Sequence, residues 1–169
     1  MGDMPLIDAL LPEFDREMGL TRRVLERVPD GQFAWQPHAT SMKVGRLAEH
    51  LAQLAHWTVV TMNQPSMDMT PSRPAGYTPP ATRTAVLEMF DSGVAGGRAA
   101  LAGKADSELM APWTLLAEGK ELFTMPKATV LRTFILNHIV HHRGQMTVYL
   151  RMLGVPIPSL YGPSGDERG

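Results

Sequence analysis

Histidine is the residue type whose spacing in this chain most directly suggests chemistry. Six histidines are present, and His138, His141 and His142 fall within five consecutive positions. Neutral imidazole nitrogen is a common ligand for divalent transition metals, and two imidazoles one helical turn apart can chelate one ion. Cysteine is absent, so a metal site must use His, Asp or Glu without thiolates. The spacing raises the hypothesis of a histidine metal site.

The helical phase of these histidines predicts which of them face the interior. At about 100° per residue from His138, the apolar stripe of this helix is centred near about 20° and includes Phe134 and Met152 at about −40°. His138 and His142 straddle this centre, whereas His141 falls near about −60°. Buried imidazoles need hydrogen-bond partners or a shared metal ion. We predict that His138 and His142 ligate one ion; the alternative is a core pair hydrogen-bonded to other helices.

A third ligand is expected from a different helix. On the second predicted helix, His50 lies at the edge of the apolar stripe, while His56 falls on a solvated face beside Glu49 and Gln53. His38 lies in a predicted loop and is expected on the surface. Glu49 adjoins His50 in sequence but points about 100° away, so we do not expect it to act as a general base.

Two further side chains share the inward face of the last helix. Gln145 falls near about −20° and Tyr149 near about 20° from His138. Either side chain could orient a ligand imidazole or contact a substrate. The alternative for Tyr149 is simple packing in the core.

Four helical segments are predicted to position these residues, because apolar residues recur along them at helical spacing. The predicted fold class is all-α: one domain of residues 1–169, a four-helix bundle with long crossover connections and a short β-hairpin before the last helix. The helices are expected at residues 7–28, from 40 or 41 to 64, at 82–102 and at 126–153; the hairpin is expected within residues 113–125, and a proline-rich crossover loop at 65–81.

Composition and charge argue against several classes of function. The formal net charge is −1 and no lysine- or arginine-rich run is present, so nucleic-acid binding is not expected. No apolar run approaches the ~20 residues that span a bilayer, so no membrane association is expected. The amino-terminal segment carries acids and lacks the basic region of a signal peptide. We therefore expect a cytoplasmic protein.

Four passages carry a family resemblance: WQP at 35–37 followed by a helix with His50-Leu51, HIVHHRGQ at 138–145, YLRMLGVP at 149–156 and PIPSLYGP at 156–163. Together they resemble the DinB/YfiT-like superfamily of bacterial metal-binding four-helix bundles. With the helix order, the resemblance covers nearly the whole chain. It implies that His50, His138 and His142 are the metal ligands, the same trio that the helical wheels select. It also implies a homodimer and a bundle with a long crossover.

The chemistry of such a site follows from its ligand number. Three neutral histidines leave at least one coordination position of a divalent ion open, as in catalytic sites, because structural zinc sites are usually closed by four protein ligands. One ion per chain is expected. Nitrogen ligation suits zinc, nickel, iron or copper.

Two classes of function remain open. The first is a metal-dependent enzyme: the resemblance suggests thiol-cofactor S-transfer, in which the metal activates a low-molecular-weight thiol, and a metal-dependent hydrolase is the nearby variant. The second is a non-catalytic metal-binding or stress-response module, in which the ion stabilises the bundle. An open metal at the base of a pocket would favour the enzyme, and a fourth protein ligand would favour the module.

Overall fold

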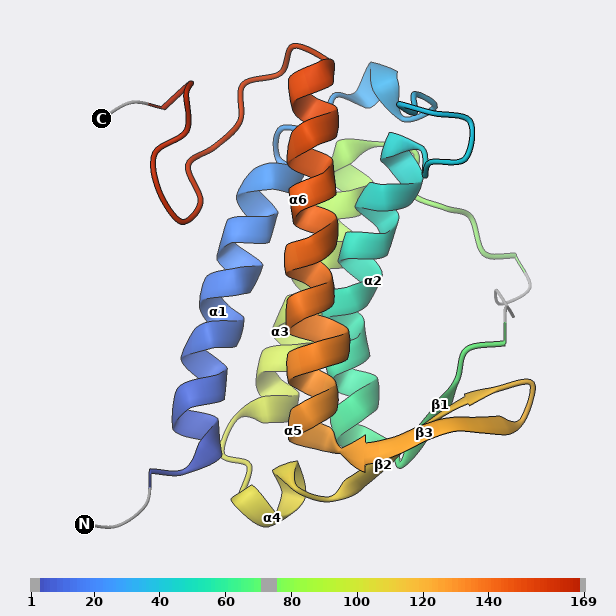
Figure 1. The fold of residues 1–169 in the computed structure, drawn as a ribbon, viewed down its shortest axis with the longest axis vertical. Helices are drawn as coiled ribbons and strands as arrows, with labels where there is room; N and C mark the ends of the chain where they lie inside the picture. Colours follow the sequence, from blue (N-terminus) through green and yellow to red (C-terminus); the bar gives the residue numbers. More distant parts are fainter. Residues whose placement is uncertain (1–3, 71–75, 168–169) are drawn as a thin grey trace.

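A computed structural model describes residues 4–70 and 76–167 of the chain. Four long helices pack side by side as a bundle with a small sheet at one end (Figure 1). Three of them are α1 (Leu6–Leu25), α2 (Val44–Asn63) and α3 (Arg83–Leu101). The fourth is built from α5 (Lys127–Val130), a π-helical segment (Leu131–Leu136) and α6 (Asn137–Met152). The predicted four-helix bundle is confirmed.

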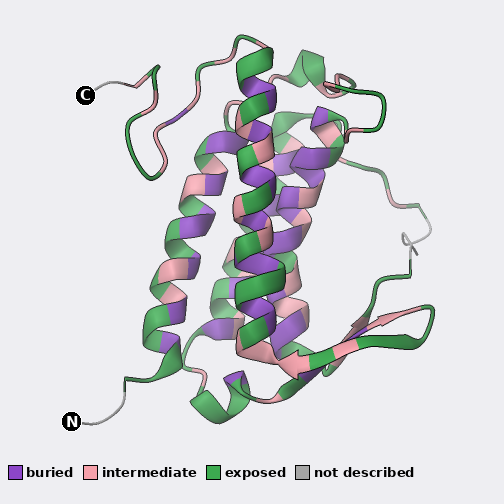
Figure 2. Cartoon of the chain, viewed as in Figure 1, coloured by how far each residue is buried: buried purple, intermediate pink, exposed green. Residues whose placement is uncertain are grey.

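The helices bury the faces that their apolar spacing predicts. Figure 2 shows the buried residues on the inward sides of the long helices. On α1 the buried apolar positions recur every three or four residues, as helical geometry requires; they include Ile7, Leu10, Phe14, Met18 and Leu25.

No helix in the described part of the chain is long and apolar enough to cross a membrane.

The helix boundaries agree with the predicted ones at some ends and differ at others. The predicted start of α3 is right, since the Thr82 hydroxyl accepts the backbone N–H of Ala85 at 3.2 Å and so caps the helix. The predicted start of α2 at residue 40 or 41 is wrong, because the helix begins at Val44. The N–H of Val44 donates to the Trp35 carbonyl at 2.9 Å, which holds the preceding residues in a turn.

The predicted hairpin is present as β2 (Pro112–Ala117) and β3 (Lys120–Pro126), which pair antiparallel. Glu118 and Gly119 connect them with φ angles of 51° and 72°. Two consecutive positive φ angles are the pattern of the type I′ turn, whose twist matches that of the flanking strands. The Glu118-Gly119 pair was therefore a sound turn signal.

A third strand occupies part of the predicted crossover loop. Residues of β1 (Ser66–Asp68) pair parallel with β2, so this part of the loop prediction is wrong. Three residues carry little local strand signal, and β1 takes its hydrogen bonds from a strand far along the chain. The loop residues 71–75 lie outside the described part. The short helix α4 (Asp106–Leu109) and a 3-10 turn (Asp30–Gln32) were also not predicted.

The buried face of the last helix differs from the predicted stripe. Phe134 and Met152, both expected to face inward, are 37% and 58% exposed, whereas Ile139 and Arg143 are buried. A π-helical turn holds more residues than an α-helical turn. The angle of about 100° per residue, which applies to an α-helix, therefore does not predict side-chain directions across the π-helical segment before Asn137. Met152 is the last residue of α6.

Candidate metal centre

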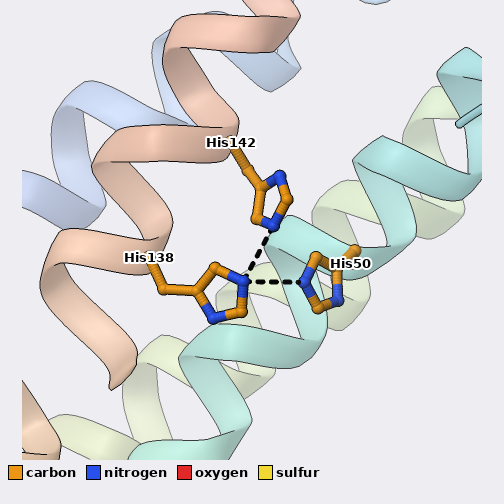
Figure 3. Close-up of side chains that lie close together, drawn as sticks. All are labelled: His50, His138 and His142. Atoms are coloured by element: carbon orange, nitrogen blue, oxygen red, sulfur yellow. Dashed lines mark hydrogen bonds between the residues drawn. The ribbon is translucent and has the colours of Figure 1, made fainter. Parts of the chain in front are cut away.

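His50 on α2 meets His138 and His142 on α6 (Figure 3). Nε2 of His138 lies 3.3 Å from Nε2 of His50 and 2.8 Å from Nε2 of His142. The candidate ligand atoms of the three residues all lie within 4.8 Å of one another. The fold therefore brings together the three histidines selected from the sequence, and this group could hold a metal ion.

The other three histidines lie outside the group. His38, His56 and His141 are all exposed, as predicted. The His141 ring centroid is 4.8 Å from that of His142, but its side chain is on the outer part of α6. The helix faces thus separate the converging histidines from the solvated ones.

The packing of α2 against α6 positions the converging rings. His138 and His142 are one turn apart on α6, and both side chains point toward His50 on α2 (Figure 3). The Trp57 ring packs edge-on against His50 at 5.9 Å and lies 6.2 Å from His138. Ile139 lies on the most deeply buried face of α6. His138 and His142 lie toward the edge of that face, so they are less buried than the core residues.

Hydrogen bonds on the far side of two rings determine which nitrogen faces the centre. Nδ1 of His138 lies 3.3 Å from the Phe134 carbonyl, which can only accept, so this nitrogen carries the proton. Nδ1 of His142 lies 2.7 Å from Oε1 of Gln145 and donates to it. In these tautomers both Nε2 atoms, 2.8 Å apart, have a lone pair available for a metal ion. A cation between them would be held by two ligand bonds.

The surroundings of the three imidazoles keep them neutral. Burial, followed by the charges of His142 and His138, lowers the pKa of His50 from 6.5 to about 4. Burial is also the main cause that lowers the pKa of His138 and of His142. Metal ligation requires the neutral ring, so the site holds its histidines in the binding form near neutral pH.

The two residues expected to support the ligands have different roles. Gln145 contacts His142 and fixes the orientation of its ring, as one of the predicted roles requires. Tyr149 is buried and its ring packs edge-on against Trp35 at 5.6 Å. This contact of Tyr149 agrees with the alternative considered from the sequence, which is simple packing in the core.

Glu49 differs from the sequence prediction, which placed it on a solvated face. It is 2% exposed, and its carboxylate accepts from Arg46 at 3.1 Å and from the Tyr77 hydroxyl at 2.5 Å. Tyr77 belongs to the described part of the proline-rich connection after residue 75, and its hydroxyl reaches the Glu49 carboxylate from there. A loop that folds back from a distance leaves no periodic signal, so the helical wheel could not detect this burial.

A cavity of about 240 Å³, here called the side cavity, borders the histidine group on the side of the sheet. His138 forms part of its wall, together with residues from α2, the sheet and the π-helical segment. The lining residues are Trp57, Thr61, Met67, Met69, Trp113, Leu115, Phe123, Val130, Phe134, Ile135 and His138. No sequence pattern predicted the cavity, because its walls come from four separate parts of the chain.

Comparison with known proteins identifies relatives along nearly the full length. A model of the DinB family matches residues 1–168. The uncharacterized protein YrdA of Bacillus subtilis (strain 168) is 26% identical over 163 residues, which cover 95% of this chain and 91% of that protein.

Two solved structures have a similar fold. A DinB-like protein from Bacillus cereus ATCC 10987 has a TM-score of 0.71 at 22% identity, with 91% of this chain and 97% of that chain covered. The DinB-like protein YjoA from Bacillus subtilis has a TM-score of 0.69 at 16% identity, with 90% and 96% covered. At these identities the likeness concerns the fold alone.

Proposed function

The chain belongs to the DinB family, and from this membership and the converging histidines we propose that it binds one divalent metal ion per chain. The proposed ligands are His50, His138 and His142. The observation that carries the proposal is the convergence of the three imidazoles, with Nε2 of His138 3.3 Å from Nε2 of His50 and 2.8 Å from Nε2 of His142.

The donor set fits such an ion. Imidazole nitrogens about 2.0–2.1 Å from a tetrahedral ion lie about 3.3 Å apart, and the separations from Nε2 of His138 are 3.3 Å and 2.8 Å. The Nδ1 protons of His138 and His142 are held by acceptors outside the centre, as is usual for metal-bound histidine. An all-nitrogen set suits zinc, nickel or iron.

We propose further that the protein is a metal-dependent enzyme. The candidate ligand group has three members within the described residues, and three ligands leave a coordination position open. When bound, the ion would supply Lewis acidity at that position. The side cavity borders His138 and offers space for a substrate. Thiol-cofactor S-transfer, for which the ion would activate a low-molecular-weight thiol, is the reaction class proposed first, and hydrolysis is the second.

A non-catalytic metal-binding or stress-response module is the alternative function. The histidines come from α2 and α6, so a bound ion would cross-link two helices of the bundle. Such a link stabilises the folded state, because the unfolded chain does not hold the three ligands together.

Metal analysis tests the ligand assignment. Protein purified without added metal should carry close to one divalent ion per chain by elemental mass spectrometry. His142→Ala should lose the ion, whereas His141→Ala, which changes the neighbouring exposed histidine, should retain it. Full occupancy in His142→Ala would refute the assignment.

Cobalt substitution separates the enzyme from the module. Titration of the cobalt protein with 2-mercaptoethanol should shift its visible absorption bands if a coordination position is open to a thiol. If the bands do not change, and removal of the metal by a chelator unfolds the protein, the module is supported instead.

We also propose that the protein is a homodimer in the cytoplasm. A closed twofold dimer is the commonest oligomer of soluble proteins, and the family resemblance favours it. Light scattering at micromolar concentration should give twice the chain mass, and a monomer mass would overturn this. Cell fractionation tests the location.

A further inference from the structure

The walls of the side cavity carry no Asp, Glu, Lys or Arg side chain. The polar members of the wall are Thr61, two indole rings and the imidazole of His138, and the remaining residues are aliphatic, aromatic or methionine. In the metal-free protein, an ion placed there would lose its hydration without gaining an opposite charge from the walls, which is costly. The cavity is therefore suited to an uncharged molecule.

Aromatic rings dominate the part of the wall that joins the sheet to the helices. Phe123 of β3 and Phe134 of the π-helical segment stack at 4.6 Å with an angle of 27° between their planes. Trp57 and Trp113 line the same space from α2 and β2. Flat aromatic surfaces favour offset stacking and edge contacts with another planar ring.

The volume of the cavity limits the size of its occupant. An apolar cavity of about 150 Å³ in another protein holds benzene. The side cavity measures about 240 Å³ and so has room for a substituted benzene ring of about ten non-hydrogen atoms.

The position of the cavity orients such a molecule toward the histidine group. His138 belongs to both the cavity wall and the candidate ligands, and Trp57 contacts His50 and His138 while it lines the cavity. Away from the sheet, the side chain that contacts a candidate ligand is polar, since Gln145 on α6 bonds to His142. An apolar substrate would therefore approach from the sheet side, and the polar side would remain for a hydrophilic co-substrate.

From these observations we infer that the side cavity binds the apolar, aromatic body of an uncharged substrate next to the metal centre. This inference rests on the proposed function, since it names the substrate class for that site. It adds a specificity determinant formed by the sheet, which the ligand histidines alone do not provide.

Calorimetric titration of the metal-free protein with two matched probes tests the inference. Acetophenone and benzoate have nearly the same shape, but acetophenone is neutral and benzoate is an anion. Acetophenone should bind at least about tenfold more tightly, because the walls offer benzoate no counter-charge. Equal or tighter binding of benzoate, or no binding of acetophenone, would overturn the inference.

A cavity-filling variant locates the probe. Met67→Trp adds bulk on the wall from β1, at a half-buried position, and should weaken acetophenone binding at least about tenfold. Leu122→Trp is the matched control, because Leu122 lies on β3 in the same sheet, is 53% exposed and does not line the cavity. Thr61→Leu fills the cavity from α2 and should have the same effect as Met67→Trp. Unchanged affinity in both filling variants would place the probe elsewhere.

Nuclear magnetic resonance links the probe to the histidine group and separates the two proposals. Acetophenone should shift the imidazole resonances of His138 in the metal-free protein and leave those of His56 unchanged. Because these measurements need no metal, the cavity inference stands or fails on the probes alone. If the protein binds acetophenone but no metal, the proposed function is refuted. If it binds metal but has equal affinity for acetophenone and benzoate, the cavity inference is refuted.

Discussion

His142 and Arg143 are consecutive residues of α6, and both are buried, with exposures of 7% and 1%. Neighbours on a helix point about 100° apart, so the two side chains enter different parts of the interior. His142 turns toward His50 and is held by Gln145, while Arg143 turns toward α1 and pairs with Glu17 at 2.6 Å. One residue step thus separates the candidate metal centre from a buried ion pair.

Loss of the support from Gln145 should weaken metal binding. In the wild type, Oε1 of Gln145 lies 2.7 Å from Nδ1 of His142 and accepts its proton. Gln145→Leu removes this acceptor, so the imidazole ring would be free to rotate. We expect the zinc affinity, measured by competition with a chromophoric chelator, to fall by about 10–100-fold. Gln145→Glu keeps an acceptor and should retain most of the affinity. Unchanged affinity in Gln145→Leu would show that the contact does not orient the ligand.

The metal-free protein should lose stability as the pH falls from about 6.5 toward about 4. The pKa of His50 is about 4 in the fold, below its unfolded value, so the unfolded state binds more protons in this window. The pKa of His138 and that of His142 are also lowered and act in the same direction. Urea unfolding with a chelator present measures the effect.

A comparison of variants assigns this pH dependence to the buried rings. His50→Gln should reduce the loss of stability between neutral pH and pH ~5, and the exposed control His56→Gln should not. Carboxylates that titrate in the same pH range change the stability of the wild type and of both variants equally, so their contribution cancels in the comparison. An equal loss in the wild type and in His50→Gln would contradict the prediction.

Among the elements, α2 and α3 pack closely because α3 presents glycine to its neighbour. A Cβ atom built on Gly93 would lie 3.0 Å from the backbone nitrogen of His56 and 3.2 Å from Cβ of Ala55. One on Gly97 would lie 3.1 Å from Cβ of Thr58 and 3.3 Å from the Ala55 carbonyl oxygen, both on α2. Since α2 carries His50, this packing fixes the backbone from which one candidate ligand projects.

Gly93→Ala should therefore destabilise the fold. The added methyl group meets backbone atoms that cannot rotate away, and we expect a net loss of about 1–2 kcal/mol in the free energy of unfolding. Gly19→Ala on α1 is the control, since a Cβ there meets nothing within 4 Å, and it should stabilise the protein by about 0.4–1 kcal/mol. Chemical denaturation measures both, and an equal gain in the two variants would refute the packing argument.

At the scale of the whole molecule, Arg143 connects α6 to α1 and to the carboxyl-terminal tail. Its guanidinium donates to the Glu17 carboxylate and backbone carbonyl, to the Thr21 hydroxyl at 3.2 Å and to the Tyr161 hydroxyl. The Tyr161 hydroxyl donates in turn to Glu17 at 2.7 Å. The described residues of the tail, up to residue 167, are thereby tied to the bundle without regular secondary structure of their own.

Arg143→Met should be strongly destabilising. It leaves the Glu17 carboxylate buried without its counter-charge, and we expect a loss of about 3–5 kcal/mol in the free energy of unfolding. Arg98→Met is the matched control, because its ion pair with Asp15 is about half exposed and should contribute less than about 1 kcal/mol. Urea unfolding of the metal-free proteins compares them, and a similar small loss in both would show that the buried pair is not structural.

Local patterns in the sequence determined the parts of this protein that repeat or that use special turn chemistry. The spacing of apolar residues determined four helices, and Glu118-Gly119 determined the hairpin turn. The four-residue spacing of His138 and His142 determined that the two rings share a face of one helix, wherever that face points. These features depend on residues close in sequence, which is why the chain alone predicts them.

Tertiary structure decided the features that depend on distant segments. The strand β1 exists because β2 supplies its hydrogen bonds, and the buried Glu49 carboxylate accepts a hydrogen bond from Tyr77, 28 positions along the chain. Arg143 is buried because Glu17 on another helix neutralises it, against the usual exposure of arginine. The side cavity has walls from separate elements, and the π-helical turn resets the phase of α6. Contacts between residues far apart in the chain leave no periodic trace in the sequence.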